Sequence, residues 1–173
     1  SVSPYKWLRW TAEIFVDVIR GIPLMILAAF IFWGIPNLIE SVTGHQSPIN
    51  DFVAGTIALS LNAAAYIAEI VRGGIQAVPI GQMEASRSLG ISYGKTMRKI
   101  ILPQMFKRVL PPLANETINL LKDTSLVYVL AMNDILRITK SIVQRDFDIS
   151  AFLVAALFYL IFTFILTNIF NYL

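Results

Sequence analysis

The sequence predicts an all-α, polytopic membrane protein, and three observations support that fold class. Hydrophobic residues make up 56% of the 173 residues and charged residues only 14%, with a mean hydropathy of +0.66. Apolar windows long enough to cross a bilayer recur along the chain. Basic residues gather in alternate connections between those windows. A soluble domain of this length carries more charge, so residues 1–173 are expected to form a single transmembrane domain.

Four apolar windows are candidate spans, at about 15–36, 52–71, 109–132 and 150–173. As an α-helix, the second window covers about 30 Å, the thickness of the hydrocarbon core. The third window is interrupted by Pro111, Pro112 and charged residues. It therefore forms either a helix shielded by its neighbours or two shorter pieces that meet inside the membrane.

Charge placement orients these spans. The connection 37–51 contains no Lys or Arg, whereas the connection 72–108 contains Glu84 and seven basic residues: Arg72, Arg87, Lys95, Arg98, Lys99, Lys107 and Arg108. By the positive-inside rule the basic connection is cytoplasmic and the other is external. Alternation then places 1–20 and the C-terminus inside and 133–149 outside. The net charge of +3 follows from this topology, so we expect no nucleic-acid role.

The basic connection contains a predicted pair of helices, within a coupling loop at about 79–103. Residues 82–89 fit a short helix that Gly90 ends with a left-handed turn, and residues 92–102 fit a second helix. The second helix is amphipathic, with an apolar stripe opposite a basic face. Two interpretations fit this hairpin: a docking element for a partner protein, or a basic unit lying on anionic lipid.

Polar residues inside the predicted spans mark a candidate substrate site, because each is costly in lipid unless it faces protein, water or a ligand. Seven helical steps along the second span bring Glu69 to within about 20° of Asn62, with Tyr66 about 40° away, so these residues share a face. The interrupted third span adds Asp123, Thr124 and Ser125. A carboxylate and hydroxyls suit an amino acid's ammonium group, and backbone N–H groups at a helix break suit its carboxylate.

Structural roles compete with these assignments. Glu69 and Arg72 are one turn apart and could form an ion pair. Lys122 and Asp123 could pair to fix subunit packing. Glu116 and Asn119, also one turn apart, could form a hydrogen-bonded interface pair.

Other kinds of site are excluded by composition and spacing. The chain has no cysteine and a single histidine, His45, so we predict no metal site. Residues 90–96, GISYGKT, imitate a phosphate loop, but three residues rather than four separate the glycines and no strand precedes them. We therefore predict neither nucleotide binding nor catalysis by this chain.

Residues 84–103, EASRSLGISYGKTMRKIILP, resemble the EAA loop of binding-protein-dependent ABC importers, whose pattern is EAA, three residues, Gly, nine residues and I-x-L-P. Every spacing matches, and one letter differs, because Ser86 stands where the pattern has its second Ala. Further stretches, at 18–24, 58–75, 81–86 and 119–126, resemble the permease subunits for polar amino acids, the histidine, glutamine, glutamate, arginine and opine group.

This resemblance implies a permease of the type I ABC importer fold with cytoplasmic coupling helices, located in the cytoplasmic membrane. The implied partners are two ATPase subunits that bind ATP and Mg, a second permease copy or homologue, and an extracytoplasmic substrate-binding protein or fused domain. The chain itself would be neither an enzyme nor a cofactor carrier. The resemblance also implies a further N-terminal helix that this sequence lacks. The implied ATPase-coupling residues are Glu84, Ala85, Ser86, Gly90, Ile100, Leu102 and Pro103.

Two other functions account for part of the sequence. An ion-coupled secondary transporter would use intramembrane carboxylates such as Glu69 and Asp123, but it has no use for a docking loop. A membrane anchor or assembly factor has little use for the polar face of the second span. The sequence therefore favours the importer subunit.

Overall fold

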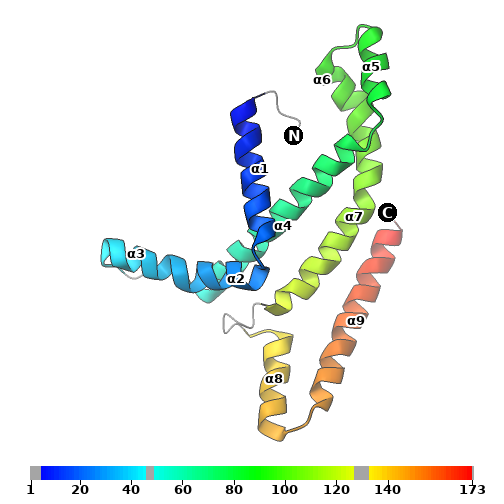
Figure 1. Ribbon diagram of the computed structural model, residues 1–173. Helices are drawn as coiled ribbons and strands as arrows, with labels where there is room; N and C mark the ends of the chain where they lie inside the picture. The colour runs from blue at the N-terminus through cyan, green and yellow to red at the C-terminus, as the bar shows by residue number, and fades with distance from the viewer. Residues whose placement is uncertain (1–4, 46–48, 127–132, 173) are drawn as a thin grey trace.

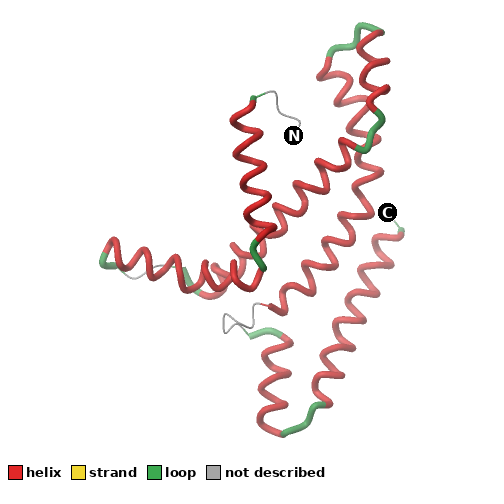
Figure 2. Tube along the Cα trace, in the orientation of Figure 1, coloured by secondary structure: helices red, strands yellow, loops and turns green. Residues whose placement is uncertain are grey.

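A computed structural model describes residues 5–45, 49–126 and 133–172. All regular secondary structure in these ranges is helical, which confirms the all-α class (Figure 2). The helices form an open arrangement in which α5 and α6 lie at one end of the molecule and the turn between α8 and α9 at the other (Figure 1). Three helical stretches have the length and apolarity to cross a membrane: 24–43, 51–76 and 150–171.

The first predicted span, about 15–36, is divided in the structure. Helix α1 (Lys6–Gly21) ends at an extended Ile22, with φ −98° and ψ 126°, and α2 (Leu24–Ala29) begins after Pro23. Proline lacks an N–H and disfavours helical backbone in the residue before it, so the chain turns here. The apolar helix then continues to residue 43. The apolar helix of the structure covers 24–43, whereas the predicted span covers about 15–36. The two ranges differ at both ends because Pro23 interrupts the helix and Pro36 does not.

Two short π-helical segments accommodate prolines within longer helices. Segment η1 (Phe30–Gly34) precedes Pro36 in α3 (Ile35–Thr43), and η2 (Met97–Ile101) precedes Pro103 in α7. A proline inside a helix leaves a carbonyl one turn earlier without its donor, and a π turn changes which carbonyls are used. In both segments the bond spans five residues: the amide of Ile35 donates to the carbonyl of Phe30, and that of Leu102 to Met97.

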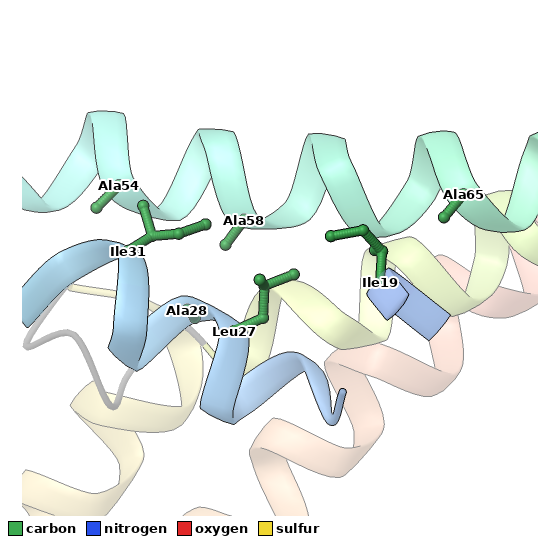
Figure 3. Close-up of a cluster of buried hydrophobic side chains, with 7 residues drawn as sticks. All are labelled: Ile19, Leu27, Ala28, Ile31, Ala54, Ala58 and Ala65. Atoms are coloured by element: carbon green, nitrogen blue, oxygen red, sulfur yellow. The ribbon is translucent and has the colours of Figure 1, made fainter. Parts of the chain in front are cut away.

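Helix α4 (Asp51–Gln76) is the centre of the fold. The side chain of Asn50 caps its first turn by accepting the amide of Val53 at 2.9 Å. Small residues on one face let α2 and η1 approach closely, in a cluster of Ile19, Leu27, Ala28, Ile31, Ala54, Ala58 and Ala65 (Figure 3). Ala63 is also buried, whereas Ala64 is exposed.

Helix α7 (Leu102–Asp123) passes through Pro111 and Pro112 without a break. It continues directly from α6 (Tyr93–Thr96) and η2, so the helix expected at 92–102 is the first part of a much longer one. Up to Asp123 the third predicted span is therefore a single helix, and 127–132 lies outside the described residues. Beside the α4–α7 crossing lies a second apolar cluster, formed by Val78, Ile101, Met105 and Val109.

The C-terminal part is a pair of helices, α8 (Ile135–Asp146) and α9 (Ser150–Asn171). Helix α8 lies within 133–149, a range that the sequence predicted only as an external connection. In the turn between them, the hydroxyl and amide of Ser150 donate to the carboxylate of Asp148 at 2.7 and 2.8 Å. These bonds hold the pKa of Asp148 below its ordinary value, and they start α9 as a cap would.

Candidate functional site

A polar cavity of about 390 Å³ lies where the break between α1 and α2 meets the middle of α4 and the C-terminal half of α7. Asn62 is near the middle of α4, with roughly 15 to 20 Å of helix on either side. The cavity therefore lies at mid-depth of a predicted span. Its lining residues are Arg20, Gly21, Ile22, Pro23, Leu24, Asn62, Tyr66, Glu116, Asn119, Lys122 and Asp123.

Each wall of the cavity follows from local structure. Pro23 opens the first wall by interrupting the helix, which leaves Arg20 at the end of α1. On α4, Asn62 and Tyr66 are four residues apart and so lie on one face; Asn62 is only 6% exposed. The third wall is a face of α7 with polar residues at i, i+3 and i+7: Glu116, Asn119 and Asp123.

Arg20 connects the cavity to its surroundings. Its guanidinium carbon lies 5.2 Å from the centre of the Tyr66 ring, a cation–π arrangement. Its Nη1 is 3.9 Å from Oε1 of Glu69. Arg20 is thereby fixed beside the cavity by two residues of α4, with its charge at the cavity wall.

The cavity presents both signs of charge without neutralising them internally. Arg20 and Lys122 are cationic, and Glu116 and Asp123 are carboxylates. Within the described ranges, none of the side chains of Asn62, Glu116, Asn119, Lys122 and Asp123 forms a hydrogen bond or ion pair. The Lys122–Asp123 ion pair and the Glu116–Asn119 hydrogen bond, both considered from the sequence, are therefore not formed among the described residues. Polar groups at membrane depth that lack protein partners suit a polar ligand or water.

The predicted substrate residues separate into two groups. Asn62, Tyr66 and Asp123 are brought together in the cavity, whereas Glu69 lies in a second cavity of about 420 Å³ between α1 and α4, with Glu13, Asp17 and Arg72. The carboxylate of Glu69 accepts a hydrogen bond from Nε of Arg72 at 2.8 Å and another from Nη2 of the same side chain. This is the Glu69–Arg72 ion pair that the sequence offered as the alternative to a substrate role.

Thr124 and Ser125 do not line the cavity. Their hydroxyls donate to the carbonyls of Leu121 and Lys122, three residues earlier, at 2.6 and 2.7 Å. Such local bonds are the usual choice of hydroxyl side chains at a helix end. Four residues of the cavity were not predicted for the substrate site: Arg20, Glu116, Asn119 and Lys122. The spacing of 116, 119 and 123 places three polar residues on one helical face and could have identified two of them.

The helical hairpin of α5 (Ile80–Ser88) and α6 is a compact unit at the opposite end of α7. Gly90 has φ +75°, in the left-handed region that the sequence suggested. The amide of Ile91 donates to the carbonyl of Ser86 and that of Gly90 to Arg87, at 3.1 and 3.0 Å, which is a Schellman motif. It satisfies the last carbonyls of α5 and returns the chain toward α6.

The residues expected to couple to an ATPase occupy different environments in this hairpin. Glu84, Ala85 and Gly90 are exposed on its surface, while Ser86 is buried. Ile100 and Leu102 are half-buried against the second apolar cluster, and Pro103 is exposed. Two apolar side chains at the two ends of α5 are exposed: Ile80, its first residue, is 76% and Leu89, beside the Gly90 turn, is 79% exposed. Exposed aliphatic groups on a short, rigid helix are suited to a protein partner.

Comparisons with known proteins agree over nearly the whole chain. The family model described as "Binding-protein-dependent transport system inner membrane component" matches residues 2–173. The arginine transport system permease protein ArtQ of Bacillus subtilis is 37% identical over 98% of this chain and 75% of its own length. The probable glutamine ABC transporter permease protein GlnM of the same organism is 40% identical over 99% of this chain and 77% of its own.

Solved structures give the same result at the level of the fold. The crystal structure of an amino acid ABC transporter with histidines superposes with a TM-score of 0.85 and 35% identity, covering 98% of this chain and 76% of that one. The MetNI methionine ABC transporter, at 19% identity, superposes with a TM-score of 0.77 and supports the fold alone.

Proposed function

This chain belongs to the family of binding-protein-dependent transport system inner membrane components, and we propose that it is the permease subunit of an ATP-driven importer for a polar amino acid. The observation that carries the substrate class is the cavity, which offers two carboxylates, two cations and two amides to one small ligand. The relatives named for arginine and glutamine transport support the same class. The chain resides in the cytoplasmic membrane as a multi-pass protein with its C-terminus inside.

The charges of the cavity match those of a zwitterion. Asp123 and Glu116 accept the ammonium group, while Arg20 and Lys122 pair with the carboxylate. Asn62 and Asn119 supply both donors and acceptors for a polar side chain. A charged ligand then replaces the missing protein partners of these groups, which is how a polar site at membrane depth becomes favourable only when occupied.

The hairpin couples this cavity to ATP hydrolysis. Two ATPase subunits, which bind ATP and Mg, dock on the hairpins of two permease copies, and an extracytoplasmic binding protein or fused domain delivers the substrate. Closure of the ATPase pair brings the hairpins together and moves the spans between inward-open and outward-open states. This chain contributes no covalent chemistry and no cofactor. It contributes the substrate site, the path across the membrane and the hairpin that couples transport to ATP hydrolysis.

An ion-coupled secondary transporter is not favoured, because Glu69, one of the carboxylates it would need, already pairs with Arg72 and Arg20. The exposed hairpin would also have no role in it.

Reconstitution distinguishes the two functions. The complex of the permease, its ATPase and its binding protein, placed in liposomes, should accumulate radiolabelled L-arginine or L-glutamine only when ATP is supplied on the hairpin side. Accumulation driven by a sodium or proton gradient, with no ATP and no ATPase subunit, would refute the importer function.

A further inference from the structure

Two buried hydroxyls join the helices of the hairpin. Oγ of Ser86 on α5 lies 2.6 Å from Oγ1 of Thr96 on α6, and these side chains are in residues that are 3% and 0% exposed. Oγ1 of Thr96 also donates to the carbonyl of Ser92 at 3.2 Å, so Ser86 is the donor to Thr96. Both hydroxyls are thus satisfied by a bond that crosses between two helices.

The bond has few companions. Most of α5 is exposed, including Glu84, Ala85 and the tip residue Leu89, and its contacts run to α6 and η2. In the described part of the chain, the hydroxyl pair is the one side-chain hydrogen bond from α5 to another helix, and the partly buried Met83 adds an apolar contact with the second cluster. A helix held by so few contacts depends strongly on each of them.

Thr96 belongs to the same continuous helical rod as the cavity wall. Segments α6, η2 and α7 follow one another from Tyr93 to Asp123 without an intervening loop, over roughly 45 Å. Glu116, Asn119 and Asp123 lie near its far end. Whatever is fastened to Thr96 is therefore fastened to the rod that carries the charged wall of the cavity (Figure 1).

We propose that the Ser86–Thr96 hydroxyl pair fastens α5 to this rod, so that force applied to α5 by the ATPase displaces the cavity wall instead of bending the hairpin. Ser86 and Thr96 are positioning residues that set the efficiency of coupling, and they touch neither the substrate nor the nucleotide. This inference rests on the proposed importer function. It gives a physical role to the one letter by which this loop departs from the EAA pattern.

The chemistry of the pair predicts unequal effects on stability but the same effect on coupling. Thr96→Val keeps the shape of the side chain but leaves the buried Ser86 hydroxyl without its acceptor, which is the costly way to lose a hydrogen bond. Ser86→Ala leaves Thr96 with its bond to Ser92, so it should cost less stability. The double variant removes both hydroxyls, and replacing both partners is often nearly neutral for stability. All three variants lack the bond between α5 and the rod, so all three should lower coupling.

The test uses the full reconstituted complex and measures amino acid transported per ATP hydrolysed, with either L-arginine or L-glutamine, whichever the unaltered complex transports. Thr96→Val should lower this ratio at least about fivefold, with basal ATPase and copurification of the ATPase unchanged. Thr96→Ser, which keeps the hydroxyl, should stay within about twofold of the unaltered complex. Ser86→Ala and the Ser86→Ala, Thr96→Val double variant, which both lack the bond, should lower the ratio about as much as Thr96→Val. Ser88→Ala is the matched control, because Ser88 is exposed on the same helix and its hydroxyl donates to the backbone carbonyl of Glu84, which is also in α5.

Each contrary outcome has a definite meaning. A normal ratio in Thr96→Val overturns the fastening role. If Thr96→Val fails to assemble, Ser86→Ala and the double variant decide: assembly with a lowered ratio supports the fastening role, and assembly with a normal ratio overturns it. A complex in which even the unaltered chain shows no ATPase response to loaded binding protein would refute the proposed function instead.

Discussion

The hairpin and the cavity are both polar regions, yet they treat their polar groups in opposite ways. In the hairpin, the buried hydroxyls of Ser86 and Thr96 bond to each other, and the helix-end carbonyls accept amides of the turn. In the cavity, side chains such as Asp123 and Lys122 have no hydrogen-bond or ion-pair partner in the described part of the chain. Polar groups that hydrogen-bond to each other make a region rigid, whereas polar groups without protein partners leave a region able to bind a polar ligand. The comparison separates the hairpin, which we propose transmits force, from the cavity, which we propose binds the substrate.

This difference predicts that removing a charge from the cavity costs transport more than stability. Asp123→Asn keeps the shape but loses the charge for the substrate ammonium, which is worth about 2 to 5 kcal/mol when buried, or at least roughly 30-fold in uptake. Thermal unfolding and copurification of the ATPase should remain unchanged. Asp51→Asn, at the exposed start of α4, is the control. Lost uptake together with lost stability would instead favour a structural pair with Lys122.

Asn62→Ala should give a smaller transport defect of the same kind, with unchanged affinity of the binding protein for the complex. Normal uptake in both variants would remove the substrate site from this cavity.

The α4–α7 crossing joins the two regions, and its two neighbouring glycines provide a matched test. A Cβ at Gly74 would overlap Cγ2 of Val109 and come within 3.2 Å of Cγ of Met105, whereas a Cβ at Gly73 meets nothing within 4 Å. Gly74→Ala should therefore destabilise the protein by about 1 to 3 kcal/mol through overpacking. Gly73→Ala should be neutral or stabilising by about 0.5 to 1 kcal/mol. Thermal unfolding in detergent measures both, and equal melting temperatures would contradict the close crossing.

The smallest functional effect is expected from two accessibility variants that place the ends of the molecule on opposite sides of the membrane. His45→Cys, after α3, should react with an impermeant thiol reagent added outside intact cells, and Ser92→Cys, in the hairpin turn, should react only after permeabilisation. Both variants should transport normally. The reverse labelling pattern would overturn the orientation and the docking role of the hairpin.

Local chemistry made the hairpin predictable from sequence. Gly90 followed a short helical pattern, and only a left-handed residue lets that helix end and turn back. The partner of Ser86 was not predictable, because the contact with Thr96 depends on how α5 and α6 pack. The length of the rod was not predicted either, because the expected helix 92–102 ended before Pro103, and Pro111 and Pro112 left open whether the third span is one helix or two pieces.

The cavity was predictable only in part, because residues on one helical face need not share one site. Asn62 and Glu69 are about 20° apart around α4 but roughly 10 Å apart along it, and the structure assigns them to different cavities. Arg20 was beyond sequence reasoning, because it reaches the site through the break at Pro23 and its contacts with Tyr66 and Glu69 are tertiary.

The π-helical segment η2 lets the rod hold one extra residue without changing the direction of its far face. A π turn accommodates one residue more than the α-helical turn it replaces, and each residue of a regular α-helix rotates the following side chains by about 100°. Deleting one residue between Met97 and Ile101 would therefore restore a regular hydrogen-bond ladder and leave Glu116, Asn119 and Asp123 facing α4. Deleting one residue from the regular part of α7 before Glu116 would instead turn these three side chains away by about that angle. The π turn is thus the place where the rod tolerates a change of length while the hairpin and the cavity wall keep their relative orientation.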